Sequence, residues 1–151
     1  MFRQRLSSAR LLLALGALAL SIPAEAQTSR LIGVQGVSVV TGREVRGGGA
    51  LAEFALSRRL WLRGSLVLGQ GETGTAWRVE TMVAFYLIPS GARWTPYAAG
   101  GFSQMWIPAE SEAALALVVG VSAAPDGGGL FVEIGPAGGL RLAAGFRVSV
   151  K

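Results

Sequence analysis

The stretch LFVEIGPAGGLRLAAGFRVSV, residues 130–150, contains the pattern that decides the fold. Hydrophobic side chains recur at every second position, and Glu133, Arg141 and Arg147 fall at the positions between them. Successive side chains of a β-strand point to opposite faces, so this alternation separates an apolar face from a face that carries charge. The glycines and Pro136 interrupt the stretch in the middle. The pattern therefore predicts two strands joined by a tight turn.

The same alternation recurs along the chain, for example in LWLRGSLVLG (residues 60–69) and TAWRVETMVAFYL (residues 75–87). Clusters of glycine, proline and polar residues separate such runs and predict turns, and the triple glycines at 47–49 and 127–129 are expected to be turns as well. Short links between consecutive strands indicate antiparallel neighbours. We therefore predict an all-β, up-and-down barrel of eight strands, at about residues 30–40, 48–56, 60–69, 75–87, 95–106, 112–124, 129–135 and 139–150.

The size of the side chains indicates which face of the barrel is the outer one. One face carries Leu, Val, Phe and Trp, whereas the opposite face is rich in Gly, Ala and Ser with scattered charges. The interior of an eight-stranded barrel is only wide enough for side chains to fill it, so the bulky face is expected to point outward, into lipid. The charged residues of the minor face then predict a lumenal charge network, paired across the interior: Glu53, Arg63, Arg78, Glu80, Glu133, Arg141 and Arg147. Within the last hairpin, Glu133 is a candidate partner of Arg141 or Arg147. In a soluble barrel, the alternative, the same charges would face water.

Aromatic residues near the strand ends give a second indication of a membrane barrel. Trp77, Trp94 and Trp106 lie close to predicted ends, as do Tyr86 and Tyr97, and membrane barrels place aromatic girdles at both interfaces. Trp61 falls on the face of Arg63 instead, so it is expected to cap the mouth of the lumen or to mark a bulge.

The N-terminal segment, residues 1–26, has the layout of a cleavable secretory signal peptide. Basic Arg3, Arg5 and Arg10 precede an apolar core of about ten residues, and a small-x-small motif ends at Ala26. That core is shorter than the roughly 20 residues of a spanning helix, although an uncleaved anchor is the alternative. We expect one domain, the barrel, over residues 27–151.

Composition excludes several kinds of chemistry. The chain has no Cys and no His, which removes thiol and imidazole catalysis and the common zinc sites. Its formal charge of +5 falls to +3 without residues 1–26, and its basic residues are dispersed, so nucleic acid is not an expected partner. GQGETG, residues 69–74, matches a nucleotide-binding pattern, but a strand-like run follows it where that pattern needs a helix. Glu110 and Glu112 are expected to lie on a solvated rim. We predict no catalytic residue, cofactor or metal.

The strand TPYAAGGF, residues 95–102, and the closing AGFRV, residues 144–148, are similar to segments of the small outer-membrane β-barrels of Gram-negative bacteria, the opacity-protein-like class. The resemblance covers residues 27–151 and implies the outer membrane as location, with membrane lipid, the barrel-assembly machinery and periplasmic chaperones as partners. Two features depart from the class. The chain ends in Ser149, Val150 and Lys151 where such barrels end in an aromatic residue, and its predicted outward loops are short.

These observations support three hypotheses for function. The leading one is an integral outer-membrane barrel with a structural or envelope-interaction role and no catalysis. The alternatives are a secreted soluble barrel that binds an apolar ligand in its interior, and a narrow porin-like channel through the outer membrane.

Overall fold

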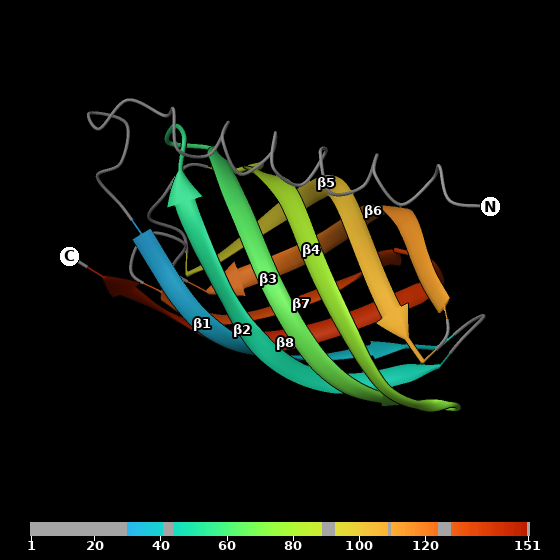
Figure 1. Ribbon diagram of the computed structural model, residues 1–151. Helices are drawn as coiled ribbons and strands as arrows, with labels where there is room; N and C mark the ends of the chain where they lie inside the picture. The colour runs from blue at the N-terminus through green and yellow to red at the C-terminus, as the bar shows by residue number, and fades with distance from the viewer. Residues whose placement is uncertain (1–29, 41–43, 89–92, 109, 124–127, 151) are drawn as a thin grey trace.

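The computed structural model describes residues 30–40, 44–88, 93–108, 110–123 and 128–150, and within them eight antiparallel strands form a closed barrel (Figure 1). The predicted signal peptide lies outside the described residues. The strands are β1 (Arg30–Val39), β2 (Val45–Ala55), β3 (Leu60–Gly71), β4 (Gly74–Tyr86), β5 (Trp94–Ile107), β6 (Glu110–Ala123), β7 (Gly128–Pro136) and β8 (Leu140–Val150). The predicted fold class, an eight-stranded up-and-down barrel, is confirmed.

Each strand pairs with its neighbours in the chain, and β1 closes the barrel by pairing with β8. That closing ladder runs from Arg30 opposite Val150 to Val39 opposite Arg141. Because β1 pairs with β8, the described sheet has no free edge strand, which is the condition for placing a sheet in lipid. Among the described residues, no helix is long and apolar enough to cross a membrane.

Glycine explains the main difference between predicted and observed strand bounds. Residues 47–49 were expected to form a turn, but they lie inside β2 and pair with both β1 and β3. A Cβ on Gly47 or Gly49 would collide with the backbone of β3 at Leu68 and Leu66. These glycines therefore allow β2 to bend closely against its neighbour, which is a common device for curving a sheet.

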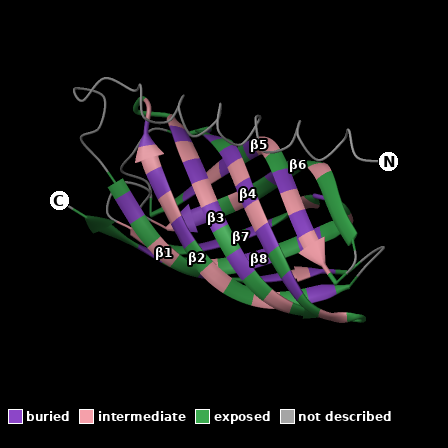
Figure 2. Cartoon of the chain, in the orientation of Figure 1, coloured by how far each residue is buried: buried purple, intermediate pink, exposed green. Residues whose placement is uncertain are grey.

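The apolar side chains lie on the outside of the barrel. In Figure 2, buried and exposed positions alternate along the strands, as expected when one face of each strand points inward. In β6, for example, Leu115, Leu117 and Val119 are 67%, 61% and 58% exposed, whereas Ala116 and Val118 between them are buried. The expected orientation, with bulky residues outward, is confirmed.

The two ends of the barrel are distinguished by the chain connections. We call the end where β1 begins and β8 ends the terminal end; it also carries the links β2–β3, β4–β5 and β6–β7. The opposite, hairpin end carries the four remaining links. One of these is the nucleotide-like motif, in which Glu72 and Thr73 form a turn between β3 and β4. A strand follows, so the motif is a hairpin, as predicted.

Apolar side chains fill the interior near both ends. Leu31, Ala55, Trp61 and Tyr86 belong to a buried cluster and lie toward the terminal end of their strands. Toward the hairpin end, Val45, Ala76 and Met105 form one cluster, and Val37, Val39, Val67 and Ala143 form another. The charged side chains share the lumen with these clusters.

Candidate functional site

Seven charged side chains are buried inside the barrel, and each is at most 3% exposed. They come from five strands: Glu53 from β2, Arg63 from β3, Arg78 and Glu80 from β4, Glu133 from β7, and Arg141 and Arg147 from β8. All seven occupy inward positions of the alternating pattern, so the structure brings every residue of the predicted lumenal network into one connected group. We call this group the lumenal network.

Two of the three glutamates join the halves of the network. Glu53 accepts hydrogen bonds from Arg63 Nε and from Arg147 Nη1. Glu133 forms an ion pair with Arg63 through Oε1 and accepts a hydrogen bond from Arg141 Nη1, at 2.6 Å, through Oε2. Glu133 therefore pairs with Arg141, which was one of its two candidate partners in the sequence. Its second arginine is Arg63 and not Arg147, which pairs with Glu53.

The third glutamate, Glu80, holds the opposite end of the network. Arg141 donates to it through Nε and Nη2, both at 3.0 Å. Arg78 Nε donates to Glu80 Oε1 at 2.8 Å, and Arg78 Nη2 donates to the carbonyl of Ala137 at 2.8 Å. Ser65 Oγ donates to Glu80 at 3.3 Å. Six ion pairs therefore connect the seven side chains in alternating sign, in the order Arg147, Glu53, Arg63, Glu133, Arg141, Glu80, Arg78.

Two tyrosines belong to the lumenal network and not to the outer surface. Tyr97 donates its hydroxyl hydrogen to Glu133 and accepts a hydrogen bond from Arg63 Nη2 at 3.4 Å. Tyr86 accepts one from Arg147 Nη1 at 3.0 Å. The expectation that both tyrosines join an aromatic girdle is therefore wrong. Tyr86 shares the inward face of β4 with Arg78, and nearness to a strand end does not decide which face a side chain occupies.

Sequence reasoning did not assign Phe131 and Ser122 to the network. The Phe131 ring lies 5.3 Å from the Arg63 guanidinium carbon and 4.9 Å from that of Arg147, within the range of cation–π attraction. Ser122 Oγ accepts a hydrogen bond from Arg147 Nη2. Both residues occupy inward positions by alternation, and this was the signal in the sequence that would have identified them.

Small residues make room for the large lumenal side chains. A Cβ added to Gly120 would lie 2.7 Å from Cζ of the Tyr97 ring and 2.7 Å from the carbonyl oxygen of Val132. A Cβ on Gly145 would lie 2.6 Å from the Phe131 ring. The glycines of the minor face are therefore part of the packing of the network.

The arrangement of the network explains why charges are tolerated inside the barrel. Burying an isolated charge costs several kcal/mol, but each glutamate here has two arginine partners in charge-assisted hydrogen bonds. The formal charge of four arginines and three glutamates is +1. Each carboxylate of the network is buried and paired with two arginines. The geometry of the network supports closing the lumen.

The predicted interfacial tryptophans lie on the outer face. Trp77 and Trp94 are each 48% exposed, and Trp106 is partly exposed. Trp77 and Trp106 are opposite one another in the β4–β5 ladder, near the hairpin end, and Trp94 lies at the terminal end. Trp61, by contrast, is buried and meets the Tyr86 ring edge-on at a centroid distance of 6.3 Å, so it packs inside the terminal end.

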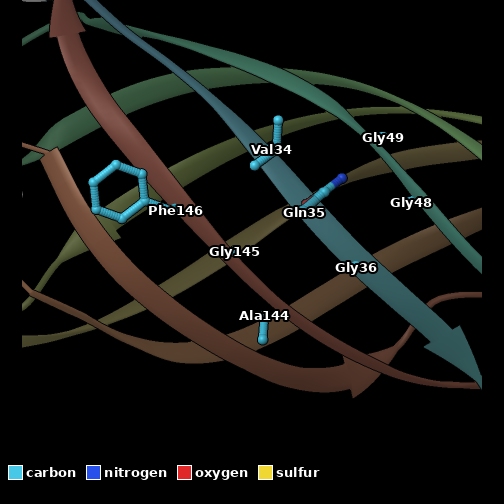
Figure 3. Close-up of a pocket in the computed structure, with 8 residues that line it drawn as sticks. All are labelled: Val34, Gln35, Gly36, Gly48, Gly49, Ala144, Gly145 and Phe146. Carbon is cyan, nitrogen blue, oxygen red and sulfur yellow. The ribbon is translucent and has the colours of Figure 1, made fainter.

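A groove lies on the outer surface of β8, β1 and β2 (Figure 3). It is lined by Val34, Gln35, Gly36, Gly48, Gly49, Ala144, Gly145 and Phe146, and none of these is charged.

Glu110 and Glu112 are exposed at the hairpin end. Within the described ranges, no group of three or more acidic side chains is placed to hold a metal ion.

Comparison with known proteins places this geometry in a structural class. No protein family and no curated protein matches the sequence. Among solved structures, the chain is similar to the N-terminal β-barrel domain of Pseudomonas aeruginosa OprF, with a TM-score of 0.57 and 14% identity over 80% of this chain and 98% of that one. The fold is that of the small eight-stranded outer-membrane β-barrels.

Two further solved structures are similar to the chain. A de novo designed transmembrane β-barrel aligns with a TM-score of 0.53 and 19% identity, over 82% of this chain and 97% of the design. Ail, the attachment invasion locus protein of Yersinia pestis, aligns with a TM-score of 0.40 and 16% identity, over 79% of this chain and 96% of Ail. The resemblance of the sequence to outer-membrane barrels thus has a counterpart in structure.

Proposed function

We propose that the protein is an integral barrel of the bacterial outer membrane, closed along its axis, with a structural or envelope-interaction role and no catalysis. The observation that carries the proposal is the inversion of polarity. Bulky hydrophobic side chains cover the outer face, whereas seven charges are buried in the lumen. A soluble barrel has the opposite arrangement, because its hydrophobic residues must leave water.

The positions of the tryptophans agree with the thickness of a membrane. Trp94 and Trp106 lie at opposite ends of β5, 12 residues apart. At about 3.3 Å per residue this distance is roughly 40 Å along the strand. A barrel tilt of about 40° reduces it to about 30 Å along the axis, close to the apolar band of outer-membrane barrels.

The lumenal network also bears on the two alternative functions. An interior apolar ligand would need an apolar cavity, but the described lumen holds arginines and glutamates between apolar layers. A channel would need a continuous path for water, and the paired side chains span the lumen from β2 to β8. Neither alternative has a specific observation in its favour.

Export and assembly complete the proposal. Residues 1–26 would direct secretion through a Sec-type pathway, and the barrel-assembly machinery with periplasmic chaperones would insert the chain. The outer-membrane barrel fold shared with the OprF domain supports this route.

Cell fractionation tests the location directly. The full chain, expressed with its N-terminal segment, is expected in the outer-membrane fraction, resistant to carbonate extraction and released by detergent. Its electrophoretic mobility in the presence of sodium dodecyl sulfate is expected to change on boiling, since a closed barrel resists unfolding by this detergent until the sample is heated. Recovery of folded protein from the periplasm without detergent would overturn the proposal.

A further inference from the structure

The two ends of the barrel carry exposed charges of opposite sign. Among the described residues, the exposed charged side chains of the terminal end are all arginines: Arg30, Arg58, Arg59 and Arg93. We call these four residues the basic rim. Those of the hairpin end are Glu44, Glu72, Glu110, Glu112 and Arg46, with Arg46 lying 3.7 Å from Glu44.

Segments outside the described residues do not reverse this asymmetry. In sequence they add Arg43 between β1 and β2, Asp126 between β6 and β7, and Lys151 after β8. In the count of charges by sequence, Asp126 and Lys151 cancel, and the segments around the β1–β2, β3–β4 and β5–β6 links keep four glutamates against two arginines. The difference in sign is therefore a property of the whole barrel sequence.

The residues of the basic rim lie on neighbouring strands and links of the terminal end. Arg30 is opposite Phe54 in the β1–β2 ladder, directly beside the link that carries Arg58 and Arg59. The Tyr86 amide donates to the carbonyl of Arg59 at 2.8 Å, so this link also contacts the end of β4. From there the β4–β5 link leads to Arg93.

Exposed apolar side chains lie next to the basic rim on the outer face. Trp94, which follows Arg93 directly, is 48% exposed. Leu87 and Ile88, which follow β4, are 55% and 44% exposed, and the Leu87 amide donates to the carbonyl of Pro96 in β5. A barrel seated in a bilayer by its apolar belt thus places these arginines at the depth of the lipid headgroups. Tryptophan and arginine at that depth are typical interfacial anchors.

We propose that the basic rim binds anionic phospholipid headgroups in the leaflet at the terminal end. This inference rests on the proposed function, because it requires the barrel to span a bilayer. Guanidinium groups form paired hydrogen bonds with phosphate oxygens, and the rim places four of them beside an apolar surface that accepts acyl chains. A basic residue near an anionic lipid surface strengthens binding about fivefold.

The test measures lipid preference around the inserted barrel. The full mature chain, residues 27–151, is folded into vesicles that contain brominated phosphatidylglycerol or brominated phosphatidylcholine, and quenching of tryptophan fluorescence reports which lipid surrounds the barrel. We expect the wild-type chain to prefer phosphatidylglycerol by at least about fivefold, the contribution of a single arginine, and 0.5 M salt to reduce the preference.

Arginine-to-glutamine variants show which end of the barrel carries the preference for phosphatidylglycerol. The triple variant Arg58→Gln, Arg59→Gln, Arg93→Gln is expected to lower the ratio to near one, and Arg93→Gln alone to lower it in part. The matched control Arg46→Gln removes one arginine from the hairpin end and is expected to leave the ratio unchanged. Electrophoretic mobility without heating checks that each variant folds. The salt dependence of the wild-type chain tests the proposal independently of any variant.

The outcomes separate this proposal from the proposed function. Equal quenching by the two lipids in the wild-type chain, or an unchanged ratio in the triple variant, would overturn lipid binding by the rim, although the quenching itself would still demonstrate insertion. An equal loss of the phosphatidylglycerol preference in Arg46→Gln would show that the preference follows the net charge of the barrel. That result would also overturn lipid binding by the basic rim. Absence of quenching by either lipid would overturn both proposals.

Discussion

Glu133 is the central residue of the lumenal network. It lies in the middle of the alternating chain of charges, with Arg63 on one side and Arg141 on the other, and it also accepts the Tyr97 hydroxyl. Removal of its charge would leave two buried guanidinium groups, each with one remaining glutamate. Loss of one partner from a buried ion pair is more costly than replacement of the whole pair, because the remaining charge stays desolvated.

The variant Glu133→Gln is therefore expected to lower the free energy of unfolding by about 3 kcal/mol. Denaturant unfolding of the barrel in lipid vesicles, followed by tryptophan fluorescence, measures the difference. Glu72→Gln makes the same chemical change in an exposed turn and is expected to shift stability by less than about 0.5 kcal/mol. Equal stability of the two variants would show that the network does not hold the barrel together.

Glycines allow a second prediction at the scale of the residue. Gly120→Ala would push a methyl group against the Tyr97 ring and the Val132 carbonyl, and such overpacking is expected to cost about 1–3 kcal/mol. Gly64 provides the control, because nothing lies within 4 Å of a Cβ at that position. Gly64→Ala is expected to be neutral or slightly stabilising in the same unfolding assay. A larger loss at Gly64 than at Gly120 would contradict the described packing.

At the scale of the element, each strand separates two environments by alternation alone. In β6 the outward residues are exposed leucines and valines, and the inward residues are alanine, valine and serine. Leu117 lies near the middle of the strand, whereas Ala113 is an outward residue close to the hairpin end. The two positions therefore sample different depths of the same face.

Depth on the outer face predicts the effect of an added charge. Leu117→Arg is expected to destabilise the barrel in lipid by about 2–4 kcal/mol, and Ala113→Arg by at most about 1 kcal/mol, because the cost of arginine falls toward the interface. Refolding into vesicles at several denaturant concentrations compares the two variants. A soluble barrel would tolerate arginine equally well at both exposed positions, so equal stability would count against a membrane location.

The elements were more predictable from sequence than their contacts. The alternation of hydrophobic and polar residues is a local signal, so it identified the eight strands and placed residues such as Arg63 and Glu80 inside the barrel. Pairing across the lumen depends on the curvature of the closed barrel, which no single strand encodes, and Arg147 was therefore not matched with Glu53. The turn predicted at residues 47–49 was wrong for a related reason, since glycine favours both turns and sharply bent strands.

At the scale of the whole molecule, apolar and charged side chains occupy the lumen of the described barrel. Apolar clusters fill both ends, and the lumenal network crosses the space between them. The wild-type protein is therefore expected to produce no discrete current steps in planar bilayers. Conductance that changes when Arg63 or Glu80 is neutralised would instead support the channel, and a protein-free bilayer treated with the same detergent is the control.

The distribution of the network over the chain has a consequence for the order of assembly. Only two of its six ion pairs, Arg63 with Glu53 and Arg78 with Glu80, form among the first six strands. The remaining four require Glu133, Arg141 or Arg147 from the last hairpin. The first six strands carry Glu53, Arg63, Arg78 and Glu80, which form two separate ion pairs. The last hairpin joins these two pairs into one network, so connection of the network and closure of the sheet become a single late event in assembly.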